Sequence, residues 1–327
     1  MKTLVTGAAG RIGSQLIDAL LANGHEVCGL DLRLTARLGT DYREITGPLQ
    51  DSDVVKSAVD GADVVFHLGA LMSWALEDKA AMFESNVEGT RILLEVAAAS
   101  GVLRFIFASS GEVYPENAPA FLPITEDHPL NANSPYGLTK LLGEELVRFH
   151  QRTGIMETVI LRFSHTQDAA ELLDEASFFS GPRFFLGPRI RQQEALGNLA
   201  NVDILRAQDP GEPAHVLSRN ETGRPFQMHI TDTRDMVAGL MLALDHPAAA
   251  GGTFNLGATD PIGFAPLLEK MSRITGYPVI PVDFPGAGVY YNTSNKLICN
   301  TLGYKPEWTI ERMLTEAAKV WEARKMG

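Results

Sequence analysis

Near its start the chain reads Lys2-Thr3-Leu4-Val5-Thr6-Gly7-Ala8-Ala9-Gly10-Arg11-Ile12-Gly13, a short apolar run followed by three glycines at intervals of three. Isoleucine and leucine residues then repeat between 14 and 22 with the spacing of a helix, which Asn23-Gly24 ends. A second apolar run covers 26–30 and stops at Asp31. The first 31 residues therefore predict a strand, a glycine turn, a helix, a second strand and a terminal acid.

Each glycine in this turn has a separate physical purpose. Gly7 lets the chain leave the strand sharply, Gly10 lets a pyrophosphate approach the backbone, and Gly13 lets the helix pack closely on the strand. The helix N-terminus offers unpaired N–H groups and a partial positive charge to phosphates. Asp31 can accept both ribose hydroxyl hydrogens and repels a 2′-phosphate, which predicts NAD rather than NADP. Arg33 is the one feature nearby that would soften this preference. The alternative is a purely structural glycine turn in another α/β protein.

The composition limits what the protein can bind. The 327 residues are 45% hydrophobic and 21% charged, an ordinary globular mixture, and the net charge of -12 disfavours nucleic acid as a partner. Cys28 and Cys299 form neither a metal-binding spacing nor a disulfide framework, which indicates a reducing, cytoplasmic setting and no metal. No apolar run is long enough to span a membrane, and the immediate start of the first strand argues against a secretory signal.

Strand and helix patterns alternate along most of the chain. Further strands are predicted at 43–46, 63–68, 103–108, 158–163, 226–230 and 253–256, and helices at 52–59, 80–100, 135–152, from Thr231-Asp232 to about 245, at 261–275 and at 310–325. This order predicts an α/β fold, a doubly wound, mainly parallel Rossmann sheet with a smaller C-terminal substrate subdomain. We expect residues 1–165, completed by about 226–257, to bind NAD. Residues 166–225 and 258–327 would then form the substrate-binding subdomain.

Polar or small residues stand at the carboxyl ends of five predicted strands. They are Gly7–Gly13, Asp31, Gly69-Ala70, Ser109-Ser110 and Ser164-His165. Ligands of doubly wound sheets bind at this edge, so we expect one shared site there.

Tyr136 and Lys140 lie four residues apart on a predicted helix, and hence on one face of it. A phenol normally titrates near ~10, and a neighbouring ammonium together with the nicotinamide cation would lower that pKa. Tyr136 could then exchange a proton with a carbinol while hydride moves to or from NAD, and Ser110 would donate to the same oxygen. The catalytic residues predicted are therefore Ser110, Tyr136 and Lys140. A tyrosine and a lysine at this spacing also occur on many helix surfaces, which is the alternative.

These motifs together resemble the extended short-chain dehydrogenases/reductases of the NAD-dependent epimerase/dehydratase family. The resemblance rests on Thr6–Gly13, Asp31, His67-Leu68-Gly69-Ala70, Asn86–Thr90, Ser109–Tyr114, Tyr136–Lys140, Leu161–Phe163, His229–Asp232 and Phe254–Gly257. It implies that NAD is held by Gly7, Gly10, Arg11, Ile12, Asp31, Leu49, Leu68, Gly69, Ala70, Asn86, Tyr136 and Lys140. It also implies a homodimer formed by the helices near 80–100 and 135–152. A face buried within the monomer is the alternative.

Departures from the family pattern bear on the substrate. Gly69 replaces the usual alanine, and the resulting His-Leu-Gly-Ala is similar to uronate dehydrogenases, which act on free sugars. His165 stands where nucleotide-sugar enzymes usually carry an asparagine, and Gly223–Phe226 replaces their Arg-Asp-Phe/Tyr. A diphosphate site is therefore disfavoured. Gly111-Glu112 stands in place of the Asp-Glu pair of the dehydratases, so elimination of water is disfavoured too.

The predicted substrate-binding residues are Ser110, Glu112, His165 and Arg183. Glu112 would orient a hydroxyl or, alternatively, be a solvated loop residue, and His165 would touch substrate or only cap its strand. Of Arg183, Arg189 and Arg191, which could bind a carboxylate or phosphate, we expect at least two on the surface.

Three other side chains are expected to be mainly structural. We expect His67 to pack inside the sheet. Met72 and Trp74 stand beside the nicotinamide edge, where either substrate contact or simple burial would explain them.

Three functions follow from this pattern. The first is an NAD-dependent oxidoreductase or epimerase that acts on a sugar or sugar-derived secondary alcohol, with Tyr136 as acid and base. The second is a dehydrogenase of a free sugar, uronate or hydroxy acid. The third is a non-catalytic NAD-binding regulatory protein, which would not need Ser110, Tyr136 and Lys140 together.

Overall fold

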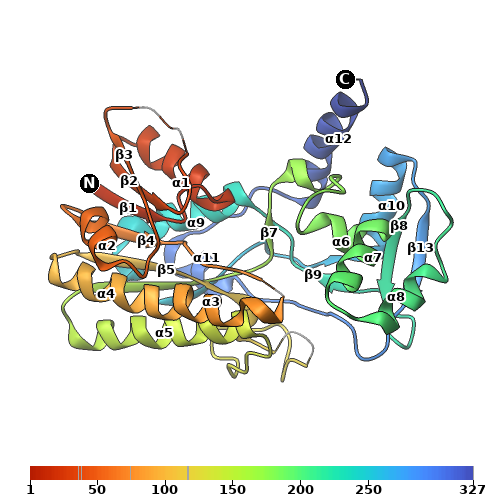
Figure 1. The fold of residues 1–327 in the computed structure, drawn as a ribbon, viewed down its shortest axis with the longest axis horizontal. Coiled ribbons are helices and arrows are strands. Elements are labelled where there is room, and N and C mark those ends of the chain that lie inside the picture. The colour runs from red at the N-terminus through yellow and green to blue at the C-terminus, as the bar shows by residue number, and fades with distance from the viewer. Residues whose placement is uncertain (36, 38, 74, 116–117, 327) are drawn as a thin grey trace.

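The computed structural model describes residues 1–35, 37, 39–73, 75–115 and 118–326 (Figure 1). Its main feature is a seven-stranded parallel sheet with the strand order β11-β6-β5-β4-β1-β2-β3. The strands are β1 (Lys2–Thr6), β2 (Glu26–Asp31), β3 (Tyr42–Thr46), β4 (Val64–His67), β5 (Arg104–Ser110), β6 (Glu157–Phe163) and β11 (Thr253–Leu256). The direction of winding reverses between β1 and β4, which opens a crevice at their carboxyl ends. This confirms the predicted doubly wound sheet.

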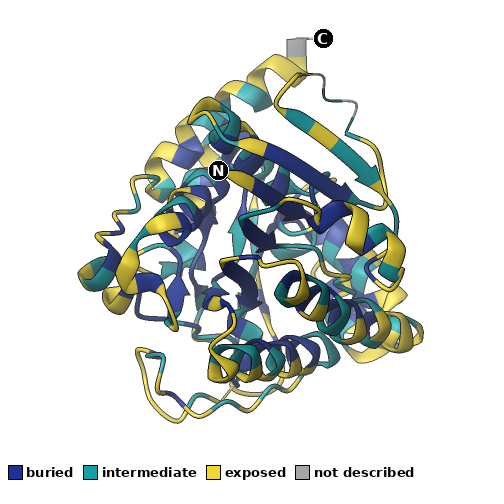
Figure 2. Cartoon of the chain, turned by 90° about the vertical axis from the view of Figure 1, so that its left-hand side faces the viewer, coloured by how far each residue is buried: buried dark blue, intermediate teal, exposed yellow. Residues whose placement is uncertain are grey.

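Helices cover both faces of the sheet. On one face lie α1 (Arg11–Ala22), α9 (Thr233–Asp245) and α11 (Lys296–Leu302), and on the other α2 (Ser52–Val59), α4 (Gly89–Ala99) and α5 (Pro135–Thr153). Because side chains alternate along a strand, Val5 joins the apolar core on the α1 side and Leu4 the core on the α2 side. Figure 2 shows the buried strands enclosed by helices whose outer faces are exposed.

The helix predicted at 80–100 is built from several pieces. It runs as α3 (Lys79–Phe83), one π-helical turn (Glu84–Glu88) and then α4. The wider turn carries Asn86, which is buried. π-Turns often occur at functional sites, and this one faces the carboxyl edge of the sheet through Leu71.

The smaller subdomain lies beyond the carboxyl edge of the sheet (Figure 1). It contains α6 (Ser180–Phe184), α7 (Leu186–Ala195), α8 (Leu199–Arg206), β8 (His215–Arg219), α10 (Phe264–Thr275), β13 (Val279–Asp283) and α12 (Ile310–Met326). Short pairs link it to the sheet: β7 (Thr166–Gln167) with β10 (Thr231–Asp232), and β9 (Gln227–Met228) with β12 (Ile262–Gly263). Single turns of 3-10 helix occur at Leu76–Asp78, Gly111–Val113, Ala169–Glu171 and Pro247–Ala249.

Three features of this part differ from the sequence prediction. The strand expected at 226–230 is only the two-residue β9, which pairs with β12 and not with the large sheet. Neither β13 nor its parallel partner β8 was predicted as a strand. α11 falls in the range assigned to the substrate subdomain, but its Ile298 and Leu302 pack in the core of the large sheet.

Candidate active site

The glycine turn is closely packed against the next strand end. Gly7 has a φ of +71°, and a Cβ added there would lie 2.9 Å from the Gly69 backbone. A Cβ on Gly13 would lie 2.1 Å from the Gly7 carbonyl oxygen. Gly10 precedes α1 and offers no side chain to cap it. The turn therefore leaves the α1 N-terminus available to phosphate, and it fits a dinucleotide.

Asp31 closes the end of β2 beside this turn. Its Oδ2 accepts a hydrogen bond from the Ala9 amide at 3.0 Å, and its Oδ1 accepts one from the Arg33 amide at 3.2 Å. The carboxylate is thereby fixed next to the glycines, where an adenosine ribose would lie in a Rossmann site. The Arg33 side chain is exposed.

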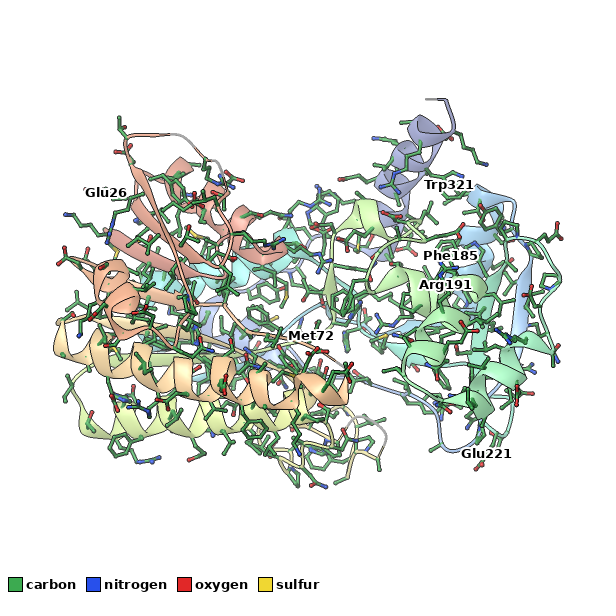
Figure 3. All side chains as sticks on the ribbon, viewed as in Figure 1. Glu26, Met72, Phe185, Arg191, Glu221 and Trp321 are labelled. Atoms are coloured by element: carbon green, nitrogen blue, oxygen red, sulfur yellow. The ribbon has the colours of Figure 1, made fainter. Side chains whose placement is uncertain are left out.

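A cavity of about 350 Å³ extends from the glycine turn into the crevice between the sheet and the subdomain. On the cofactor side its lining includes Gly7, Gly10, Arg11, Ile12, Gly13, Leu68 and Ala70. The lining also includes Ser110, Glu112, Tyr136, Lys140, His165 and Arg183. All three predicted catalytic residues and all four predicted substrate residues thus meet in one cavity. Met72 lines it as well, and Figure 3 shows this residue between the two lobes.

Four predicted cofactor residues stand behind this lining. Asp31 lies as described, Gly69 contacts the glycine turn, and Leu49 is buried beside Gly89. The Asn86 side chain bonds both backbone groups of Leu71, at 2.7 and 2.8 Å. It therefore fixes the loop after β4, and its contact with the cofactor stays a prediction.

Tyr136 and Lys140 project from the first two turns of α5. Ser134 caps this helix by accepting from the Gly137 amide at 2.9 Å. The Lys140 ammonium donates to the Ala108 carbonyl at 2.8 Å and lies 5.7 Å from the Tyr136 ring centre. Ser110 ends β5, and its Oγ accepts from the Glu112 amide at 3.1 Å.

Burial controls the protonation of this pair. It lowers the pKa of Lys140 to about 8, against the opposing effect of Glu144. It raises the pKa of Tyr136 above its usual value, and the Glu112 carboxylate raises it further. Among the protein's own groups, desolvation of the phenol is therefore the larger effect, and the lowering expected from Lys140 together with the nicotinamide cation stays a prediction.

Glu112 is held in place and faces the cavity. Ser134 Oγ donates to its Oε2 at 2.6 Å. Burial raises the pKa of Glu112, while the Ser134 bond and the charge of Arg183 lower it. A freely solvated loop glutamate, the alternative prediction, does not describe this residue.

His165 and Arg183 form a joint unit on the subdomain side. Arg183 Nη1 lies 2.7 Å from His165 Nε2, and the imidazole packs edge-to-face on Phe179 at 4.7 Å. Burial, and then the Arg183 charge, lower the pKa of His165 well below its usual value, so the ring is neutral. His165 therefore does more than cap its strand.

The other candidate side chains lie outside the cavity. The expectation that at least two of the three arginines lie on the surface is wrong, because only Arg191 is exposed. Arg183 lines the cavity, and Arg189 is half-buried beside the Phe284 ring at 5.6 Å. His67 is buried between Thr6 and Thr90, as predicted. Trp74 lies outside the described residues.

Phe179, Met228 and Tyr291 line the cavity but carry no local sequence signal that would have identified them. The Tyr291 hydroxyl donates to the Gly111 carbonyl at 2.7 Å. A Cβ on Gly111 would lie only 2.1 Å from that hydroxyl oxygen. Tyr291 thus occupies the space beside position 111, where the dehydratase pattern has an acid.

A buried network of ion pairs and hydrogen bonds lies behind the catalytic residues and holds their elements together. Glu144 accepts two hydrogen bonds from Arg162, at 2.9 and 2.8 Å, and one from Ser109 at 2.6 Å. Lys140 stands one turn before Glu144 on α5. The network therefore ties α5 to β5 and β6, the strands that carry Ser110 and His165 at their ends.

A metal centre and a membrane-spanning helix are both absent from the described part of the chain. No group of three or more metal-ligating side chains occurs among the described residues. In the same part of the chain, no helix is both long and apolar enough to cross a membrane.

Comparison with known proteins agrees with this geometry. The model of the NAD-dependent epimerase/dehydratase family matches residues 3–167. A crystal structure of a short-chain dehydrogenase/reductase superfamily protein from Agrobacterium tumefaciens with bound NAD is 64% identical, with a TM-score of 0.96 over 99% of this chain and 98% of that one. The UDP-glucose 4-epimerase of Erwinia amylovora is 29% identical over 84% of this chain and 83% of its own.

A more distant structure shares the fold. The UDP-glucose 4-epimerase of Thermotoga maritima, solved with UDP-glucose, is 24% identical and has a TM-score of 0.78 over 99% of this chain and all 100% of that one. The matched motifs lie on the strand ends that form the cavity. The chain therefore belongs to the NAD-dependent epimerase/dehydratase family.

Proposed function

We propose that the protein is an NAD-dependent oxidoreductase or epimerase that acts on a sugar or a sugar-derived secondary alcohol. The observation that carries the proposal is the meeting of Ser110, Tyr136 and Lys140 with the glycine turn in one cavity. Family membership and the NAD-bound relative support the same conclusion. A non-catalytic NAD-binding protein is the weaker interpretation, because binding alone does not require this trio.

The cofactor side of the cavity fits NAD. In our proposal the α1 N-terminus holds the pyrophosphate, Asp31 accepts from the adenosine ribose, and Lys140 donates to the other ribose. When bound, NAD supplies the acceptor and donor of hydride. Asn86 keeps the loop after β4 in place, and Leu68 and Ala70 present small surfaces to the ligand.

Tyr136 would be the acid and base of the reaction. On oxidation, Tyr136 would act as the phenolate: its oxygen would take the hydroxyl proton while the hydrogen of the carbinol carbon leaves as hydride to NAD, and a carbonyl would remain. Ser110 Oγ would donate to that oxygen and orient it. Since burial favours the neutral phenol, Tyr136 is prepared to return the proton on reduction. The Lys140 charge would assist the opposite step.

An epimerase and a dehydrogenase differ in the fate of the reduced cofactor. An epimerase reduces the other face of its keto intermediate, so no net NADH appears. A dehydrogenase releases one NADH for each substrate oxidised. Absorbance at the NADH band, measured together with product chromatography over a set of sugars and hydroxy acids, separates the two. Absence of any NAD-dependent product across the set would contradict the enzymatic proposal.

We also propose that the two lobes bind different ligands. Residues 1–165, with 226–257 and α11, would hold NAD, and the remaining residues of 166–225 and 258–327 would cover the substrate. The two free cysteines fit a reducing compartment, and we propose the cytoplasm.

A homodimer is the assembly that the surface favours. α4 and α5 run side by side (Figure 1), and Leu138, Leu142 and Phe149 on α5 are exposed. In our proposal these helices pair with their copies across a twofold axis. Light scattering should give twice the monomer mass of 35.5 kDa for the wild type and the monomer mass for Leu142→Glu.

A further inference from the structure

A set of buried hydrogen bonds runs behind the cavity and passes through His67. This residue ends β4 and is 1% exposed. Its Nδ1 lies 2.8 Å from Thr6 Oγ1, and its Nε2 lies 2.8 Å from Thr90 Oγ1. Thr6 is the last residue of β1, directly before Gly7, and Thr90 stands in the first turn of α4. The imidazole therefore bridges the glycine turn and α4.

The ring of His67 is uncharged. Burial, and then the charge of Lys140, lower its pKa to about 3. The Lys140 ammonium and the His67 ring both lie beside the Phe107 ring, at 5.1 and 5.6 Å from its centre. A second cation in this place would be repelled by Lys140. His67 therefore carries one hydrogen, on one of its two ring nitrogens.

The neighbouring hydroxyls decide which nitrogen carries that hydrogen. Thr90 Oγ1 donates to the Asn86 carbonyl at 2.6 Å, and a hydroxyl has only one hydrogen to donate. Thr90 must therefore accept from His67, which places the hydrogen on Nε2. Nδ1 is then an acceptor. Thr6 Oγ1 donates to it and accepts from the Gly69 amide at 2.9 Å.

The other tautomer would leave a hydroxyl without an acceptor. Among the described residues, the polar partners of Thr6 Oγ1 are His67 Nδ1 and the Gly69 amide. With the hydrogen on Nδ1, both partners would be donors. The Thr6 hydroxyl hydrogen would then be unpaired at a residue that is only 1% exposed, which is unfavourable. The Nε2–H tautomer pairs each of these donors.

The hydrogen bonds continue from Asn86 to the helix that carries Tyr136. The Asn86 side chain donates to Thr139 Oγ1 at 3.0 Å, and Thr139 donates to the Tyr136 carbonyl at 2.7 Å. The same side-chain amide holds both backbone groups of Leu71, in the loop after β4. One connected chain of hydrogen bonds thus joins the glycine turn, this loop and the first turn of α5.

We propose that His67 is a positioning residue, which as its Nε2–H tautomer aligns Tyr136 with the glycine turn through this chain. His67 does not line the cavity, so it acts through Thr6 on one side and through Thr90 and Asn86 on the other. The inference rests on the proposed function, in which Tyr136 is the acid and base. Alignment matters because a displacement of about 1 Å in a reacting group can lower a rate by about 100-fold.

Neutron diffraction from crystals of the deuterated, NAD-bound protein tests the direction of the chain. We expect a deuteron on His67 Nε2 and none on Nδ1. The Thr6 hydroxyl should point at Nδ1, and the Thr90 hydroxyl at the Asn86 carbonyl. A deuteron on Nδ1, alone or together with one on Nε2, overturns the inference.

Thr90→Val tests the positioning role in solution, because valine keeps the shape of threonine and removes the hydroxyl. For the best substrate among the sugars and hydroxy acids, we expect kcat to fall by about tenfold or more, with the dissociation constant for NAD within about threefold of the wild type. Thr139→Val, which cuts the chain at its other end, should give the same pattern.

Two control variants accompany these measurements. Thr90→Ser keeps the hydroxyl and should stay within about threefold of the wild type in kcat and in NAD affinity. Thr315→Val removes the same kind of bond, from a hydroxyl to the Glu311 carbonyl one turn earlier at 2.8 Å, but on the exposed face of α12. It should behave as the wild type.

The outcomes separate this inference from the proposed function. If Thr90→Val and Thr139→Val lower only the thermal midpoint and leave kcat unchanged, the chain is merely structural, and the inference fails while the proposed function stands. Equal losses of kcat in Thr90→Ser and Thr90→Val also overturn it, because the hydroxyl would not be responsible. If the wild type converts no compound, the proposed function fails, and the positioning role fails with it.

Discussion

Replacing Glu144 by glutamine should destabilise the protein strongly. Glu144 has no exposed side-chain surface, and the side chain of its partner Arg162 is 2% exposed. Burial by itself would raise the pKa of Glu144, but the bonds and charge of Arg162, with Ser109 and Arg148, together outweigh burial and lower it, so the carboxylate is charged. Glutamine keeps the volume and removes the charge. It leaves the Arg162 guanidinium buried without its counter-ion.

The magnitude follows from the cost of an uncompensated buried charge. Breaking a buried ion pair by removing one partner costs about 3–5 kcal/mol, a large share of a total stability of about 5–15 kcal/mol. At about 2 °C per kcal/mol for a large domain, the thermal midpoint should fall by about 6–10 °C.

Scanning calorimetry or thermal denaturation followed by circular dichroism measures this shift. The control is Glu88→Gln, which removes an exposed ion pair with Arg91 and should leave the midpoint unchanged. A fall of less than about 2 °C in Glu144→Gln would refute the view that this network carries a large part of the stability.

Three further perturbations test separate parts of the structure. Gly111→Ala should lower the free energy of unfolding by about 1–3 kcal/mol, because its Cβ would lie 2.1 Å from the Tyr291 hydroxyl. In thermal denaturation, adding Tyr291→Phe should recover part of that loss. Equal midpoints for Gly111→Ala and wild type would contradict the contact. Burial lowers the pKa of His67 to about 3. Below about pH 6.5 this histidine therefore binds a proton in the unfolded chain but not in the folded protein. The free energy of unfolding should fall by up to about 1.4 kcal/mol per pH unit between about pH 6.5 and pH 3. Urea titrations should show a flatter pH profile for His67→Gln, and parallel profiles would argue against a neutral buried His67. Asp31→Asn should reduce the ratio of kcat/KM for NAD over NADP by at least about tenfold, and an unchanged ratio would show that Asp31 does not read the ribose.

Local patterns predicted the large sheet well because each of its elements carries its own signal. The apolar runs at β1, β2 and β4 are strands buried on both faces, and Asp51 caps α2 through the Asp53 and Val54 amides at 3.0 and 3.2 Å. β13 escaped prediction because Pro281 interrupts its short apolar run, and because its partner β8 lies far away in the sequence. α11 is only seven residues long, too short for a periodic pattern to be recognised.

The candidate site also contains residues that local sequence patterns predict and residues that they do not. Ser110, Tyr136, Lys140 and the glycines stand at strand ends or early in helices, where the parallel topology brings them together. Tyr291 reaches the cavity from a segment between β13 and α11, and only tertiary packing places it against Gly111. The direction of the pKa shift of Tyr136 could not be inferred from its spacing to Lys140, because desolvation depends on the whole surrounding fold.

The central claim is that the Tyr136 hydroxyl exchanges the substrate proton in a cavity that also holds NAD. Turnover by Tyr136→Phe, measured together with its NAD dissociation constant, tests this most directly, with Tyr277→Phe in the subdomain core as the control. We predict a fall in kcat of about 100- to 10,000-fold with NAD affinity within about threefold of the wild type. Turnover within tenfold of the wild type in Tyr136→Phe would contradict the account.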